Sequence, residues 1–335
     1  MESRELVRQT LEFASPPRIP HQLWTLPWAS EHFPQELSKI QARFPDDIIG
    51  SPAFYRQQPV VTGDPYVVGT YTDEWGCTFV SRQRGVIGEV KQPLLATWED
   101  LDKLRLPEEE LSVDVEQVNA FCRSSGLFIQ GGCCPRPFER LQFLRRSDNL
   151  YMDLGEQPPE LFECIHRLHE FFIKEMELWA ETEVDFLGFM DDWGSQRALL
   201  ISPAMWRKIF KPLYKDYIDI AHSHGKYCFM HSDGYIADII PDLVELGLDA
   251  INSQLFCMDI ESLGSQFKEK ITFWGEIDRQ HLLATGTRDE VAAAVRRVKE
   301  ALYQEGGVIA QCEFGPGGNP DNVFTVFETW EKMAG

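Results

Sequence analysis

The stretch Tyr227-Cys228-Phe229-Met230-His231-Ser232-Asp233-Gly234 is an apolar run that stops abruptly at a histidine and an aspartate. Side chains of a β-strand alternate between two faces, so His231 and Asp233 point the same way if this run is a strand. A second apolar run, Val308 to Cys312, ends at a cysteine before a glycine-rich turn. Because His, Asp and Cys all bind zinc, and catalytic zinc keeps three protein ligands and one open position, these three residues predict a metal site.

The rest of the chain predicts the fold that would bring such strand ends together. Short apolar runs alternate with longer amphipathic stretches, which is typical of repeated strand–helix units. The runs are 19–24, 47–50, 127–131, 184–190, 227–231, 250–253, 271–274 and 308–312. They predict an α/β fold, a single (β/α)8 TIM barrel over residues 1–335, with an N-terminal embellishment that includes a β-hairpin insertion near 60–95. The alternative is a doubly wound open sheet, but no GxGxxG motif or P-loop follows a strand, which excludes its nucleotide-binding versions.

Helix signals fall between these runs. Pro159 predicts a helix that continues to about Ala180, and Ser202-Pro203 is an N-cap followed by proline for a helix over 204–223. Thr287 and Glu290 form a capping box that leads into a helix over 291–304.

Composition limits the partners. The formal net charge of −21, from 53 acidic against 32 basic residues, argues against nucleic acid and against anionic membranes. Nothing approaches the roughly 18 uncharged apolar residues of a spanning helix, and the charged amino terminus does not resemble a signal peptide. The eight scattered cysteines form no CxxC pair, and most of them are expected to be buried packing residues. We expect a cytoplasmic protein that acts on a small molecule.

Other polar residues follow the predicted strands. Asp191 and Asp192 come directly after 184–190, and paired acids can raise one pKa and supply a general acid or base. The alternative is that one of them caps the turn or pairs with Arg197. Gln254 could orient a substrate or a metal ligand, or serve as a further metal ligand itself. Glu276 is a candidate further metal ligand or catalytic group, unless it only caps a helix or is solvated.

At these residues the chain resembles the uroporphyrinogen decarboxylase superfamily, which includes cobamide-dependent methyltransferases of the methylcobalamin:coenzyme M type. The resemblance covers nearly the whole chain and is strongest after residue 184. It rests on five motifs in the family's order: Phe189 to Gly194, Ile201 to Pro203 with Phe210 to Tyr214, His231 to Gly234, Trp274 to Asp278, and Cys312 to Asn322. The resemblance implies the same (β/α)8 fold.

Two departures favour the methyltransferase branch. The decarboxylases carry arginines after the first strand, where this chain reads His21-Gln22-Leu23-Trp24-Thr25-Leu26-Pro27-Trp28. They also place a histidine where this chain has Cys312. The methyltransferases hold zinc with His-x-Cys and a distant Cys, whereas Asp233 stands here in place of the first cysteine. Aspartate is a harder ligand than thiolate and donates less charge to zinc, which makes a zinc-bound thiol or phenol a different nucleophile.

The resemblance therefore implies a zinc-dependent methyltransferase that moves a methyl group between a small methylated substrate or thiol and a corrinoid such as methylcobalamin, supplied by a partner protein. In this interpretation Trp24, Trp28 and Trp193 line an apolar pocket, and Asp191 or Asp192 manages a proton. One alternative is a metal-free decarboxylase of a tetrapyrrole or related acid, with Arg136, Arg140 and Arg197 as its cationic candidates. Another is a barrel that binds a ligand without catalysis. A homo-oligomer is compatible with the sequence.

Overall fold

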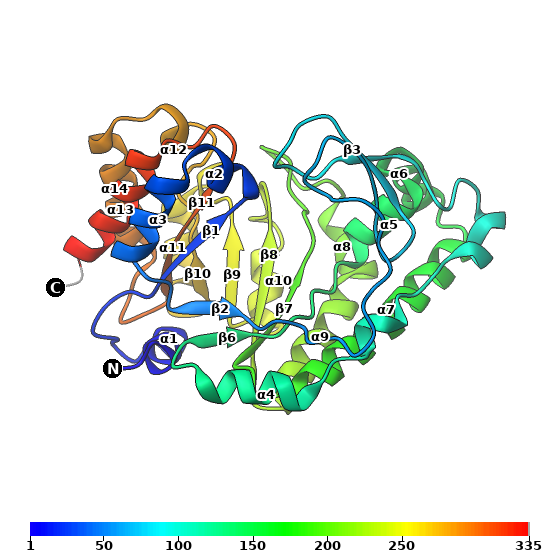
Figure 1. Ribbon diagram of the computed structural model, residues 1–335, viewed down its shortest axis with the longest axis horizontal. Helices are drawn as coiled ribbons and strands as arrows, with labels where there is room; N and C mark the ends of the chain where they lie inside the picture. Colours follow the sequence, from blue (N-terminus) through cyan, green and yellow to red (C-terminus); the bar gives the residue numbers. More distant parts are fainter. Residues whose placement is uncertain (334–335) are drawn as a thin grey trace.

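The computed structural model describes residues 1–333, and its centre is a sheet of eight parallel strands bent into a barrel (Figure 1). The strands are β1 (His21–Thr25), β2 (Ile48–Gly50), β6 (Phe128–Gln130), β7 (Phe186–Met190), β8 (Tyr227–Ser232), β9 (Ala250–Ser253), β10 (Thr272–Trp274) and β11 (Val308–Phe314). Their order is β1-β11-β10-β9-β8-β7-β6-β2. All eight runs expected from the sequence are strands, so the predicted (β/α)8 barrel is confirmed.

The barrel closes between β1 and β2 through residues that precede β2. The Asp47 backbone N–H donates to the His21 carbonyl at 2.8 Å. The Asp47 carboxylate accepts from the His21 N–H at 2.8 Å, and the Asp46 carboxylate accepts from the Leu23 N–H at 2.7 Å. The two aspartates therefore replace ladder hydrogen bonds at this seam.

Alternation along the strands divides the side chains into two layers. Phe128, Phe186, Phe229, Trp274 and Ile309 pack together inside the barrel and fill its floor. The alternate residues pack outward against the helices in a larger core. A filled floor leaves the carboxyl ends of the strands as the place where polar side chains can meet.

Residues between β2 and β6 form a separate antiparallel sheet of β3 (Gly69–Thr72), β4 (Thr78–Ser81) and β5 (Glu89–Gln92). The sequence predicted a hairpin here, and the structure adds a third strand to it. In Figure 1 the β3 region lies across the barrel mouth from α2 (Pro27–His32) and α12 (Leu282–Thr285).

Further helices surround the sheet. They are α1 (Ser3–Leu11), α3 (Pro34–Arg43), α4 (Val115–Ser124), α5 (Pro137–Arg145), α6 (Ser147–Glu156), α7 (Pro159–Ala180), α8 (Pro203–Ile209), α9 (Lys211–Ser223), α10 (Ile240–Glu245), α11 (Ile260–Phe267), α13 (Arg288–Leu302) and α14 (Pro320–Lys332). The prediction of one helix over 204–223 is wrong, because it is divided at Phe210. Pro212 has no N–H to donate to the preceding turn, so α9 starts anew with proline in its first turn.

The capping box of Thr287 and Glu290 is confirmed at the start of α13. All eight cysteines are free thiols, and most of them are buried. Within residues 1–333, no helix is long and apolar enough to cross a membrane.

Candidate active site

Three polar side chains meet at the carboxyl ends of β7 and β8. The Nε2 atom of His231 lies 3.7 Å from an oxygen of Asp192 and 3.7 Å from Oδ1 of Asp233. One potential ligand atom from each residue lies within 4.8 Å of the other two. The expectation that His231 and Asp233 share a face is confirmed, and Asp192 joins them from the neighbouring strand.

The second ring nitrogen of His231, Nδ1, is fixed by a hydrogen bond to Asn252. Asn252, on β9, donates its amide N–H to the Trp274 carbonyl, so its Oδ1 is the acceptor for Nδ1–H of His231 at 2.6 Å. This assigns the ring proton to Nδ1 and leaves the Nε2 lone pair facing two carboxylates. Oδ1 of Asp233 is buried and has no hydrogen-bond donor. A cation among the three groups would stabilise this arrangement, and a histidine oriented in this way is typical of metal ligands.

Main-chain contacts between two turns set the spacing of the aspartates. The Asp233 N–H donates to Asp192 at 2.8 Å, and the Gly194 N–H donates to the Asp233 carbonyl at 3.0 Å. Gly234 has a φ of +78°, and a Cβ on it would overlap the backbone of Gly194. Positions 194 and 234 both need glycine because the backbones of the two turns touch there.

Arg279 lies beside this group and pairs with three acids. Its guanidinium contacts Asp233, reaches Glu276 at 3.4 Å, and reaches Glu313 at 3.0 Å. Glu276 is 3% exposed, and this burial raises the pKa of its carboxyl to about 8 despite the nearby arginine. Burial also raises the pKa of Glu313. Glu276 therefore keeps a proton at neutral pH that it can donate.

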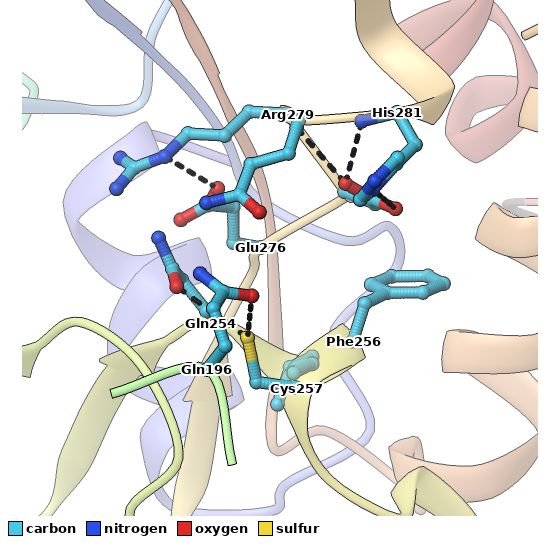
Figure 2. Close-up of a pocket in the computed structure, with 10 residues that line it drawn as sticks. Gln196, Gln254, Phe256, Cys257, Glu276, Arg279 and His281 are labelled. Atoms are coloured by element: carbon cyan, nitrogen blue, oxygen red, sulfur yellow. Dashed lines mark hydrogen bonds and ion pairs between the residues drawn. The ribbon is translucent and has the colours of Figure 1, made fainter. Parts of the chain in front are cut away.

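A small cavity of about 60 Å³ adjoins Arg279 and Glu276 (Figure 2). Gln254 lies on its wall, where Oε1 accepts from the Gly234 N–H at 3.1 Å and from the Cys257 thiol at 3.5 Å. Figure 2 shows Gln196 beside Cys257, with the ring of Phe256 to the right of both. This volume suits a small substrate group, because a water molecule takes about 30 Å³ in the liquid.

The structure does not bring Cys312 to this group. Gln311 and Glu313, its neighbours on β11, reach Asn252 and Arg279 in the barrel, so Cys312 faces the opposite side. It packs in the outer core with Val308, Ala310 and Phe314 and is fully buried. Burial raises the pKa of the Cys312 thiol well above its usual range, which opposes the thiolate that a metal needs. The placement of Cys312 with His231 and Asp233 was wrong.

Asp191 and Trp193 also face away from the barrel interior. Asp191 accepts from the N–H groups of Phe138 and Glu139 and, at 2.5 Å, from the Tyr214 hydroxyl, so it caps α5. Trp193 is fully buried and stacks on Phe138 with 4.1 Å between ring centroids. Asp191 therefore has a structural role, but it caps helix α5 and not the turn that the alternative named. Trp193 supports the core instead of lining a pocket.

Trp24 does lie at the site, with its ring centroid 5.4 Å from that of His231. Trp28 stacks on His32 in α2 at 4.4 Å. Sequence reasoning missed Asn252, Arg279 and Glu313. Asn252 could have been found because it precedes Gln254 by two residues and so shares its face. Arg279 had only its position three residues after Glu276 as a signal.

Comparison with known proteins agrees with this architecture. The sequence profile of the family described as Uroporphyrinogen decarboxylase (URO-D) matches residues 70–333. None of the curated proteins matches the chain. A solved structure described as a methyltransferase from Methanosarcina mazei superposes with a TM-score of 0.66 at 15% identity and covers 100% of both chains.

Two further structures are more distant. The 3-keto-D-glucoside 4-epimerase from E. coli has a TM-score of 0.39 at 15% identity, over 70% of this chain and 94% of its own. An endo-beta-1,4-xylanase from Gloeophyllum trabeum has a TM-score of 0.44 at 11% identity, over 96% and 99%. At 15% identity, the similarity to the methyltransferase structure shows the fold alone.

Proposed function

Since this chain belongs to the uroporphyrinogen decarboxylase family, whose profile covers residues 70–333, we propose that it is a zinc-dependent methyltransferase of that family. Its reaction would move a methyl group between a small methylated substrate or thiol and a corrinoid carried by a partner protein. The observation that carries the proposal is the meeting of Asp192, His231 and Asp233 around an unpartnered carboxylate oxygen.

These three residues fit a divalent ion. One imidazole nitrogen and two carboxylate oxygens are a ligand set that zinc accepts, and it leaves a coordination position open. Bound zinc would lower the pKa of a thiol ligand or neutralise the negative charge on a departing group. The ligand set has two oxygens and no sulfur, so it favours a methoxy or amine substrate over a thiol.

The surrounding residues have separate roles in this proposal. Asn252 holds the His231 ring with Nε2 facing the two carboxylates. Arg279 holds Asp233 and balances part of the acidic charge around it. Glu276 lines the small cavity and would supply a proton to the leaving group, because its raised pKa keeps it protonated at neutral pH.

Charge argues against the decarboxylase alternative. A substrate with many carboxylates needs cationic partners. Arg140 forms an ion pair with Asp73 at 2.6 Å, and Arg136 lies 3.7 Å from Glu139. Arg197 is exposed to solvent. The mouth of the barrel holds more acids than bases, which suits a cation better than a polycarboxylate.

Metal analysis of protein purified without chelator tests the proposal. We expect about one zinc ion per chain in the wild type, and loss of that zinc in His231→Ala and Asp192→Asn. Cys312→Ser is the matched variant, and it should retain zinc because its thiol packs outside the barrel. Wild-type protein without bound metal, or zinc content that does not change in His231→Ala, would rule out the metal site.

The methyl-transfer step needs its own measurement. The zinc-loaded protein should convert the absorbance spectrum of free cob(I)alamin to that of methylcobalamin when a methoxy or methylamine compound is added. His231→Ala should abolish the conversion. A fully zinc-loaded protein that leaves every such spectrum unchanged would refute the methyltransferase assignment while the metal site stands.

A further inference from the structure

A second cavity, of about 200 Å³, lies at the carboxyl end of β6. Its walls come from three parts of the chain that are distant in sequence: the loop after β6, helix α7, and the segment between β2 and α4. The loop after β6 and the start of α5 contribute Gly132, Cys134, Arg136 and Arg140. Helix α7 contributes Phe172 and Glu175, and the segment between β2 and α4 contributes Tyr55, Glu74, Trp75 and Glu110. The cavity is separate from the small pocket beside Arg279, because the two share no lining residue.

Two carboxyl groups face this cavity without a basic partner. Glu175 is only 5% exposed, and within residues 1–333 no basic nitrogen lies within 4.0 Å of its carboxylate or of that of Glu110. The two arginines of the wall face other acids: Arg140 is held by Asp73 at 2.6 Å and by Glu74 at 3.6 Å, and Arg136 lies 3.7 Å from Glu139. Burial and the mutual repulsion of the acids raise the pKa of both Glu110 and Glu175. Both groups can therefore hold a proton at neutral pH, and a cation bound beside them would favour their ionised forms.

Size and geometry indicate the kind of cation. Glu74, Glu110 and Glu175 do not bring their oxygens within 4.8 Å of one another, whereas Asp192, His231 and Asp233 do. The cavity volume is several times the roughly 30 Å³ of a water molecule, so a bare metal ion would not fill it. A larger cation that touches several carboxylates at once is the better fit.

Aromatic side chains complete the wall. Tyr55, Trp75 and Phe172 line the cavity beside the acids. The Trp75 ring already packs against a cation, because the Arg140 guanidinium lies 4.6 Å from its centroid. Carboxylates together with aromatic faces are the surroundings in which proteins bind alkylammonium groups. We propose that this cavity binds a small organic ammonium ion.

This inference rests on the proposed function for the identity of the molecule: the ammonium group would belong to the substrate whose methyl group is transferred. The cavity lies at the end of β6, and the His231 group lies at the ends of β7 and β8, the next two strands of the barrel. Arg136 lines the cavity and faces Glu139, whose charge in turn acts on Asp192 and His231. Arg136 and Glu139 therefore connect the cavity electrostatically with the proposed metal site.

Isothermal titration calorimetry with choline tests the proposal, and 3,3-dimethylbutan-1-ol, which has the same shape without the charge, is the matched ligand. We expect saturable choline binding to the wild type and at least tenfold weaker binding of the neutral alcohol. Glu175→Gln and Glu110→Gln should each weaken choline binding about tenfold. Glu177→Gln, on the exposed side of the same helix, should bind choline as the wild type does.

The ammonium site and the zinc-dependent methyltransferase can be refuted independently of each other. Asp192→Asn is expected to lose zinc and still bind choline, so choline binding without zinc would support the cavity even if the methyltransferase assignment fails. The ammonium site is refuted if wild-type protein does not bind choline, or if the alcohol binds equally well. A second zinc ion that disappears in Glu175→Gln would also refute it. Glu110 is only half-buried, so Glu110→Gln keeps the test valid if Glu175→Gln does not fold.

Discussion

Glu276 is the residue at which burial and function conflict most directly. Its carboxyl is almost completely enclosed, and its basic neighbour Arg279 is shared with Asp233 and Glu313. Burial therefore prevails, and the pKa of Glu276 rises from about 4.5 to about 8. A protonated acid beside a small pocket is useful as a proton donor, and it makes the stability of the fold depend on pH.

This raised pKa predicts the direction of that dependence. Between about pH 4.5 and pH 8 the folded protein holds a proton on Glu276 that the unfolded chain has lost, so the free energy of unfolding should fall as the pH rises. The side chain of Glu276→Gln cannot ionise. Between pH 5 and pH 8 we therefore expect the free energy of unfolding to fall less in this variant than in the wild type, by on the order of 2 kcal/mol. Urea unfolding at the two pH values measures this difference. Parallel losses in both proteins would contradict it, and Glu177→Gln is the exposed control.

At the scale of single elements, the two turns after β7 and β8 explain what the sequence could and could not predict. The run that ends at His231 showed which residues share a face, because polar residues broke the apolar pattern there. Strand β11 is buried on both sides, so its pattern does not indicate which face looks inward. Cys312 was therefore assigned to the wrong face, and Glu313 was missed.

The contact between Gly194 and Gly234 gives a prediction at this scale. Gly234→Ala combines a positive φ with a backbone overlap, and we expect it to cost about 2 kcal/mol or more. Gly155→Ala is the matched control, because Gly155 lies in α6 with open space around it and alanine favours helices. Calorimetric melting should show opposite shifts for the two variants. A Gly234→Ala protein that melts at the wild-type temperature would show that the turns are not tightly packed.

At the scale of the whole molecule, the barrel followed from the alternation of apolar runs with helix signals, since every run became a strand of the same sheet. The insertion was harder to predict, because its position depends on contacts between distant residues. Arg140 of α5 reaches across to Asp73 at 2.6 Å, with both side chains buried. Neither residue carries a local pattern that reveals the other as its partner.

That buried pair predicts how the insertion is attached. Arg140→Ala leaves Asp73 buried without its partner and should destabilise the attachment by about 3 kcal/mol. We expect amide hydrogen exchange to accelerate over residues 69–92 while β7 and β8 remain protected. Gln142→Ala, in the same helix and half-exposed, should leave the exchange unchanged. Uniform acceleration across the barrel would instead show that the insertion and the barrel unfold together.

The backbone contact between Gly194 and Gly234 has a consequence for ion selectivity at the proposed metal site. Asp192 and Asp233 each lie close in sequence to one of these glycines, so main-chain atoms with little freedom to move set the gap between their carboxylates. A site of this kind cannot widen at low cost for an ion of larger radius. Small divalent ions should therefore bind in preference to calcium or cadmium, and this discrimination would arise from the peptide backbone as well as from the ligand atoms.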